Sequence, residues 1–251
     1  MSAGSQGMQP LADRRAMLRA AGGFLATLLA PGVMLYAFGA QSEPAGGQAS
    51  AKVRWGLLID VGRCPPGCDL CVAACRDENG WHESDRPEID AQWIRKVKLH
   101  DPRTGASREV PVMCQHCDKP ACVDVCPTGA SFQRADGIVL VDKHICIGCR
   151  FCMMACPYKA RSFVHEPQTA QKPWAPRGKG TVEGCTLCVH RLDSARLPAC
   201  VEACAEKGGG AMLFGDLNDP NSDIAKAVAK HASMQIRSEL GLGPAVHYQN
   251  L

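Results

Sequence analysis

The chain has 251 residues, 16 of them cysteine, and a formal net charge of +3 at pH 7. Small disulfide scaffolds are usually shorter than ~80 residues, so this length disfavours a disulfide framework. The basic residues form no run and lack interleaved aromatic residues, which disfavours nucleic-acid binding. After the N-terminal region, about 200 residues remain, enough for one compact domain or two fused small lobes. Aromatic residues make up only 5% of the chain, so the core is expected to be modest.

Residues 1–40 have the layout of a twin-arginine (Tat) export signal. Arg14 and Arg15 precede an uncharged stretch, residues 20–40, that is rich in Leu, Ala and Gly. Tat signals export folded proteins, which suits thiol-rich proteins that must be assembled in the reducing cytoplasm. The segment therefore predicts a periplasmic protein. A chance Arg-Arg pair before a buried helix is the alternative.

The signal is either cleaved near residue 40 or retained as a membrane anchor. Ala37 and Gly39 are small residues at the positions required for cleavage before Ala40. The uncharged stretch is also long enough to span a bilayer, so a retained anchor stays open. Residues 41–51 are polar and rich in Gly and Ser, which predicts a linker to a domain over residues 52–251.

The first strand is predicted over residues 53–60, ahead of the first cysteine group. This group occupies residues 64–75 with the spacing C-x3-C-x2-C-x3-C and is followed by Arg76. A short helix is expected to begin near Val72 and to carry the last cysteine of the group. The stretch 76–113 is predicted to be an insertion.

The second cysteine group, residues 114–126, has the spacing C-x2-C-x4-C-x3-C-P. A short helix that carries its last cysteine is expected near Val123. Two short strands, 130–132 and 137–141, are predicted to form a hairpin around an Asp-Gly turn.

The third group, residues 146–156, matches the bacterial ferredoxin run C-x2-C-x2-C-x3-C-P without a departure. Three cysteines on a tight loop can bind three corners of a [4Fe–4S] cube, and Gly148 lets the backbone approach closely. The fourth cysteine is expected on a helical turn near Met153, which Pro157 ends. It reaches the other cluster of a pair.

The fourth group, residues 185–204, has the spacing C-x2-C, an eleven-residue excursion and C-x3-C. The preceding stretch 157–184 is a second predicted insertion. Within it, residues 172–180 predict a rigid, basic and exposed segment that is either a docking loop or a plain connector.

The remaining elements follow the last cysteine. A strand is predicted over residues 211–214. Residues 219–222 are expected to cap a helix over 223–232. The tail after Gly241 is expected to be irregular.

All sixteen cysteines are candidate iron ligands, and no cysteine is left over. Each [4Fe–4S] cluster needs four thiolates, so the four groups predict four clusters and an electron-transfer protein. The expected fold is α+β, with tandem bacterial-ferredoxin-like lobes and long loop insertions, and the groups form an internal repeat, one-two and three-four. Structural zinc sites with four cysteine ligands are the alternative. The cysteines are Cys64, Cys68, Cys71, Cys75, Cys114, Cys117, Cys122, Cys126, Cys146, Cys149, Cys152, Cys156, Cys185, Cys188, Cys200 and Cys204.

Several basic residues lie beside the cysteine groups and are either local counter-charges or ordinary solvated surface. Each oxidised cluster with four thiolates carries roughly −2, so four clusters would make the protein anionic. His116 lies between two candidate ligands and either donates a hydrogen bond that tunes a cluster or is a plain structural histidine. No nucleophile, phosphate loop or paired carboxylates stand out. The basic residues are Arg63, Arg76, Lys119, Arg150, Lys159 and Arg161.

The four groups, in this order and after a twin-arginine signal, resemble the four-cluster subunits of the molybdopterin oxidoreductase and formate dehydrogenase families. The resemblance is closer still to the periplasmic iron–sulfur subunits of the Dsr membrane complexes of sulfur metabolism. It covers nearly the whole mature chain. The segments that carry it are residues 53–60, 90–97, 113–117, 125–167 and 175–190.

This resemblance implies an electron-transfer subunit that is not an enzyme by itself. Its implied partners are an integral-membrane quinone-interacting protein of the NrfD type and a multihaem cytochrome c, and it would be held at the membrane through them. An electron-transfer subunit of a molybdopterin oxidoreductase and a zinc-stabilised adaptor module are the alternatives.

The resemblance also implies that the cysteine groups exchange their fourth ligands. Cys156 joins the first three cysteines of the second group, and Cys126 joins those of the third. Likewise, Cys204 joins the first three of the first group, and Cys75 those of the fourth.

Overall fold

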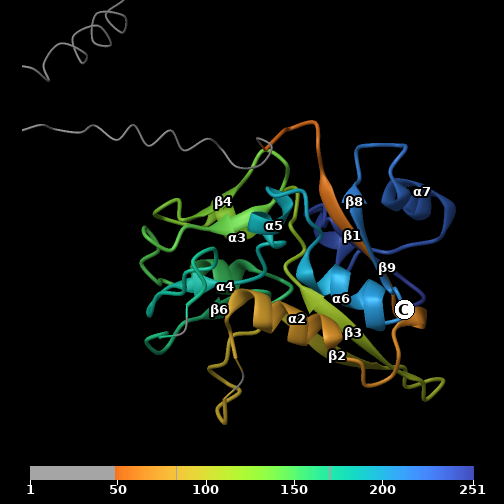
Figure 1. Ribbon diagram of the computed structural model, residues 1–251, viewed down its shortest axis with the longest axis horizontal. Coiled ribbons are helices and arrows are strands. Elements are labelled where there is room, and N and C mark those ends of the chain that lie inside the picture. Colours follow the sequence, from red (N-terminus) through yellow and green to blue (C-terminus); the bar gives the residue numbers. More distant parts are fainter. Residues whose placement is uncertain (1–48, 83, 170) are drawn as a thin grey trace, which may run out of the picture. The chain divides into compact units, whose positions relative to one another are not determined.

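The computed structural model describes residues 49–82, 84–169 and 171–251 (Figure 1). The export signal and its cleavage site, expected within residues 1–40, lie outside these ranges. No helix in the described ranges is both long and apolar enough to cross a membrane.

A three-stranded sheet has β1 (Trp55–Asp60) at its centre, between antiparallel β8 (Met212–Asp216) and parallel β9 (Val246–Gln249). The predicted strands at 53–60 and 211–214 are therefore confirmed. Leu57 and Ile59 on β1 are almost fully buried, as expected for a central strand.

The tail after Gly241 is not irregular, which corrects the sequence-based expectation. Its strand β9 pairs with β1 through Leu57 opposite Val246 and Ile59 opposite Tyr248. Val246 and Tyr248 are almost fully buried because they fill the space beside the central strand. Two alternating apolar residues are too short a pattern to predict this pairing.

Short helices follow or contain the cysteine groups: α2 (Leu70–Asn79), α3 (Ala121–Asp124), α4 (Phe151–Ala155), α5 (Val189–Leu192) and α6 (Ala199–Lys207). The helices expected near Val72, Val123 and Met153 are present. Cys75 lies within α2 as expected, but Cys126 and Cys156 lie just beyond α3 and α4. Each of these two helices ends before the last cysteine of its group.

Among the described residues, the remaining strands form three two-stranded antiparallel sheets. The pairs are β2 (Ile94–His100) with β3 (Ser107–Met113), β4 (Ser131–Gln133) with β5 (Val139–Val141), and β6 (Ser162–Phe163) with β7 (Val182–Glu183). The β4–β5 hairpin confirms the predicted strands around the Asp-Gly turn. The β2–β3 hairpin lies inside the predicted insertion 76–113 and was not anticipated.

The last helix, α7 (Asp223–Lys230), begins where predicted and ends two residues early. Ser222 caps it by accepting a hydrogen bond from the Ala225 amide at 3.1 Å. Ile224 is buried against the sheet. Two single-turn helices, η2 (Val61–Arg63) and η3 (Ser238–Leu240), complete the elements.

Candidate metal-cluster sites

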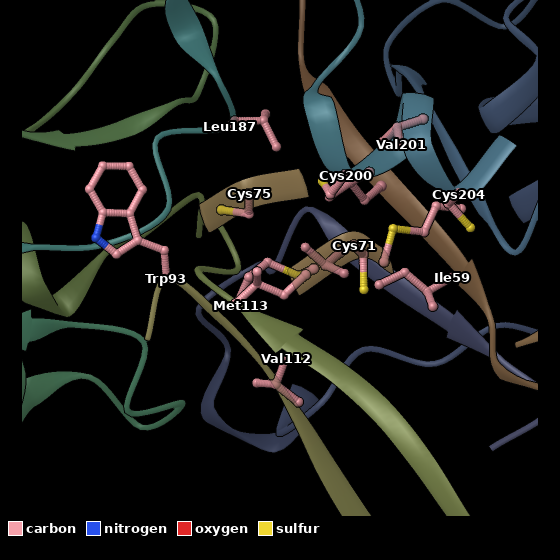
Figure 2. Close-up of a cluster of buried hydrophobic side chains, with 14 of the residues drawn as sticks. Ile59, Cys71, Cys75, Trp93, Val112, Met113, Leu187, Cys200, Val201 and Cys204 are labelled. Carbon is pink, nitrogen blue, oxygen red and sulfur yellow. The ribbon is translucent and has the colours of Figure 1, made fainter. Parts of the chain in front are cut away.

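Helices α2 and α6 lie side by side and each carries two cysteines four residues apart (Figures 1 and 2). On a helix, this spacing places both side chains on one face, one turn apart. Cys71 neighbours Cys204, and Cys75 neighbours Cys200, so the two helices run in opposite directions. The facing helices thus bring together the first and fourth cysteine groups.

Site A is the set formed by Cys64, Cys68, Cys71 and Cys204. Burial raises the pKa of the Cys71 thiol to about 12, and Lys96 opposes this rise. The neighbouring sulfurs that raise it further are Cys64, Cys204 and Cys68. The structure therefore gathers three cysteines of the first group with the last cysteine of the fourth.

Site B is the set formed by Cys75, Cys185, Cys188 and Cys200, which line one cavity together with Leu57, Ile94 and Met113. Burial raises the pKa of Cys75 well above its ordinary value, and Cys185 and Cys188 add to the rise. Asn79 is close enough to Cys75 for its side-chain amide to donate to the sulfur at 3.6 Å.

Site C is the set formed by Cys114, Cys117, Cys122 and Cys156, and all four are buried. Burial raises the pKa of Cys114 to about 12 and that of Cys117 to about 11, and Cys122 and Cys156 contribute to both rises. Cys122 lies in α3, and Cys156 directly follows α4; the two helices are in contact. The second group thus meets the last cysteine of the third.

Site D is the set formed by Cys126, Cys146, Cys149 and Cys152, which line a second cavity. Gly148 lies in its loop with a φ of 68°, and an added Cβ there would lie 2.1 Å from the carbonyl oxygen of Gly180. The backbone at Gly148 thus packs closely against the segment that leads into β7, and its approach to a cluster stays a prediction.

The sites follow one another in the order A, B, C, D. Cys71 of site A neighbours Cys200 of site B. Cys185 of site B neighbours Cys114 of site C, and Cys122 of site C neighbours Cys152 of site D. Along the sequence the groups form an internal repeat, one-two and three-four. In the structure the helix pairs α2–α6 and α3–α4 bring the first group to the fourth and the second to the third, which is the exchange that the resemblance implies.

Exposure differs along this series. Cys149 of site D is exposed, and Cys64 and Cys68 of site A are half-buried. The four sulfurs of site C are buried, as are those of site B apart from half-buried Cys185. Both ends of the series thus reach the surface, while its middle is enclosed.

Each cysteine set offers the four thiolates that a [4Fe–4S] cluster needs. Within residues 49–82, 84–169 and 171–251, no group of three or more His, Cys, Asp or Glu side chains has the arrangement of a metal-ion site.

Backbone amides also donate to the cysteine sulfurs, as expected around a cluster. At site D, the amides of Ser131 and Val182 donate to Cys126 at 3.3 Å and Cys146 at 3.4 Å. At site B, the amide of Leu187 donates to Cys185 at 3.4 Å.

Among the described residues, two cationic side chains donate hydrogen bonds to cysteine sulfurs. Arg161 donates to Cys122 at 3.2 Å, and Lys96 donates to Cys64 at 3.3 Å. Of the six basic residues singled out in the sequence, only Arg161 donates to a sulfur within the described residues. Lys96 was missed because it lies 32 positions from Cys64 and reaches it only through the β2–β3 hairpin.

The other basic residues have different contacts. Arg63 donates to the Gly209 carbonyl at 3.0 Å, and Arg150 lies 3.8 Å from the centre of the Phe163 ring. Arg76 pairs with the adjacent Asp77.

His116 is buried and neutral. Burial lowers its pKa to about 3, and Arg161 and Arg54 add to the effect. Its Nδ1 accepts a hydrogen bond from the Val139 amide at 3.0 Å, so Nε2 carries the proton. Nε2 has no hydrogen-bond partner among the described residues. A hydrogen bond from His116 to a cluster stays a prediction that this free donor supports.

The segment 172–180 is not uniformly exposed, contrary to expectation. Ala175 and Arg177 are buried, and Arg177 pairs with the buried Glu183 at 2.9 Å. Trp174 donates to the backbone carbonyl of Glu78 at the end of α2. These contacts attach the segment to the protein, and its role in docking stays a prediction.

A model described as "4Fe-4S dicluster domain" matches residues 107–217, which contain the second, third and fourth cysteine groups. The chain is 43% identical to the Hdr-like menaquinol oxidoreductase iron-sulfur subunit 1 of Archaeoglobus fulgidus over 231 residues, covering 80% of this chain and 84% of the relative. It is 41% identical to a subunit of the tetrathionate reductase of Salmonella typhimurium over 211 residues, covering 81% and 75%. It is 37% identical to a subunit of the sulfite dehydrogenase of Allochromatium vinosum over 213 residues, covering 76% and 81%.

The chain belongs to the family of ferredoxin-like [4Fe–4S] subunits of molybdopterin-type oxidoreductases. Several of its relatives are named as iron–sulfur subunits of oxidoreductases, and the chain holds several [4Fe–4S] clusters. The match to a 4Fe-4S dicluster domain and the small helices and strands of the structure together fit an α+β ferredoxin-like fold.

Proposed function

We propose that the protein relays electrons through four [4Fe–4S] clusters, bound at sites A, B, C and D. Each cluster is held by the four thiolates of its site, and each supplies a centre that accepts and releases one electron. The protein's own contribution is to fix the distances between neighbouring centres and to surround them with amide and cationic donors. The protein acts as an electron-transfer subunit and performs no substrate chemistry by itself.

The observation that carries this proposal is the single series of sites with enclosed middle members and accessible ends. Electrons can pass between adjacent sites because cysteines of one site neighbour those of the next. Burial of sites B and C protects the centres from solvent. Exposure of Cys149 at site D offers one end to a redox partner.

The surface around site D suits such a partner. Ile147 and Met154 are each 67% exposed, and Phe151 is 50% exposed. Large exposed apolar residues that gather around one site favour a protein–protein contact. We assign this surface to contact with another redox subunit.

The host complex that we propose is a Dsr-type complex of sulfur metabolism, with this chain in the place of its periplasmic subunit DsrO. Its partners are then a membrane quinone-interacting subunit of the NrfD type and a multihaem cytochrome c. The segments of resemblance between the cysteine groups support this choice, and so does the relative that is named a menaquinol oxidoreductase subunit. The twin-arginine pattern supports export to the periplasm.

A second candidate host is a molybdopterin oxidoreductase, favoured by the relatives from tetrathionate reductase and sulfite dehydrogenase. In that host, the same four sites would serve a large molybdopterin subunit.

The two hosts are separated by anaerobic affinity purification of the tagged protein from solubilised membranes, followed by mass spectrometry and haem staining. Co-purification of a c-type cytochrome and a multi-span quinone-site protein, without a molybdopterin subunit, is the expected result. A large molybdopterin partner would contradict the Dsr-type assignment and leave the relay itself standing.

A further inference from the structure

Three arginine side chains are buried within the described residues, and one of them differs from the others. Arg177 pairs with Glu183 at 2.9 Å, and Arg191 pairs with Glu78 at 2.8 Å. Arg161, which is 8% exposed, has no carboxylate within 4.0 Å in the described part of the chain. Its guanidinium therefore needs another source of negative charge, because an unpaired buried cation is strongly destabilising.

The groups around Arg161 identify that source. Its Nη2 donates to the sulfur of Cys122 at 3.2 Å and to the hydroxyl of Ser131 at 3.1 Å. The backbone amide of Ser131 in turn donates to the sulfur of Cys126 at 3.3 Å. Cys122 belongs to site C, and Cys126 belongs to site D. Arg161 thus lies between two neighbouring sites and remains charged at every accessible pH.

A fixed cation in this place affects electron transfer directly. When a cluster is reduced, it gains one electron from its neighbour, which is oxidised by one electron, and no proton needs to move. The added negative charge is stabilised by a nearby positive charge, most strongly where water is excluded. Net charge and hydrogen bonds to the sulfurs are among the factors that set cluster potentials.

Lys96 provides the comparison at the other end of the series. Its Nζ donates to Cys64 of site A at 3.3 Å. It also lies 3.9 Å from the carboxylate of Glu109, which offsets part of its charge. Arg161 has no such offset among the described residues.

We propose that Arg161 is a built-in positive charge that raises the reduction potentials of sites C and D and draws electrons toward that half of the relay. This inference rests on the four-cluster function proposed above. It assigns a role to a side chain that is not a ligand, and it explains why a buried arginine faces sulfur instead of a carboxylate.

The test is a redox titration followed by electron paramagnetic resonance on the anaerobically purified full complex. Arg161→Gln keeps a hydrogen-bond donor and removes the charge. It should lower the potentials of at most two couples, with an equilibrium constant for reduction that falls about tenfold or more, ~59 mV for a one-electron couple. Arg161→Lys keeps the charge and should stay within about threefold of the wild type. Lys96→Gln should lower a different couple and leave those two unchanged.

A second measurement uses wild-type protein, so it tests the role of Arg161 even if a variant loses its cluster. Protein labelled with nitrogen-15 arginine should show arginine nitrogen coupled to a reduced cluster spin in a pulsed resonance experiment, and the signal should vanish in labelled Arg161→Lys. Absence of the coupling in wild type, or unchanged couples in an iron-loaded Arg161→Gln, would overturn the role of Arg161. The titration of the wild type comes first. If it shows no iron–sulfur couples, the proposed function itself is overturned.

Discussion

The loop of site D depends on a glycine whose replacement should have a calculable cost. Gly148 has a φ of 68°, and a Cβ added there would lie 2.1 Å from the Gly180 carbonyl oxygen. Left-handed backbone costs a residue with a Cβ roughly 1–2 kcal/mol, and overpacking against a rigid neighbour adds about 1–3 kcal/mol. Gly148→Ala should therefore destabilise this loop by about 2–5 kcal/mol.

Gly180→Ala is a matched control for this change. Gly180 also has a positive φ, 85°, but nothing lies within 4 Å of the position of its added Cβ. It should cost only the backbone strain, about 1 kcal/mol. The pair of variants thus separates strain from the steric clash.

The assay is the rate at which an iron chelator removes iron from the anaerobic protein. A cost of 2 kcal/mol makes an open loop about 30-fold more populated, so Gly148→Ala should release the iron of one cluster at least about 30-fold faster. Gly180→Ala should accelerate release only about fivefold. Equal rates in the two variants would refute the claim that the backbone contact holds this loop.

Three further predictions concern other parts of the protein. Burial raises the pKa of Glu78, but hydrogen bonds from His190 and Arg191 outweigh it and leave the pKa below 4.5. The stabilisation from Glu78 is therefore present above pH 4.5 and lost as pH falls below it, so the unfolding midpoints of wild type and Glu78→Gln should differ at pH 7 and converge in acid. Ile147→Lys should slow electron exchange with the partner without lowering iron content, as measured by stopped-flow on the purified complex. Ser222→Ala removes the cap of α7, at about 1 kcal/mol, and should speed amide hydrogen exchange in that helix about fivefold.

Each of these predictions has a result that contradicts it. A pH-independent difference between wild type and Glu78→Gln would show that Glu78 acts through packing instead of charge. Leu99→Lys, at an exposed position on β2, is the control for Ile147→Lys. Equal effects of the two variants on electron exchange would show that the surface around site D does not contact the partner. Unchanged exchange in the Ser222 variant would show that the cap does not hold α7.

The sequence predicts local elements well where short-range patterns decide them. The Asp-Gly turn at 136–137 sets the β4–β5 hairpin, and Ser222 marks the start of α7 because a side-chain oxygen can satisfy a free amide there. The spacing of Cys146, Cys149 and Cys152 similarly predicts one tight loop.

Long-range features could not be read in this way. The pairing of β9 with β1 joins residues from opposite ends of the domain, and its apolar pattern is only two residues long. The contact of Lys96 with Cys64 depends on how the β2–β3 hairpin folds over α2. Arg161 was one of six similar basic residues in the sequence, and only tertiary packing distinguishes it by leaving it without a carboxylate.

The presence of four clusters in one series is tested most directly by counting the clusters. The anaerobically purified protein should contain about sixteen iron atoms and as many acid-labile sulfides per chain, four for each cluster. On full reduction, resonance spectra should integrate to four cluster spins with interactions between neighbours. Iron for only two clusters, or zinc in place of iron, would contradict the relay.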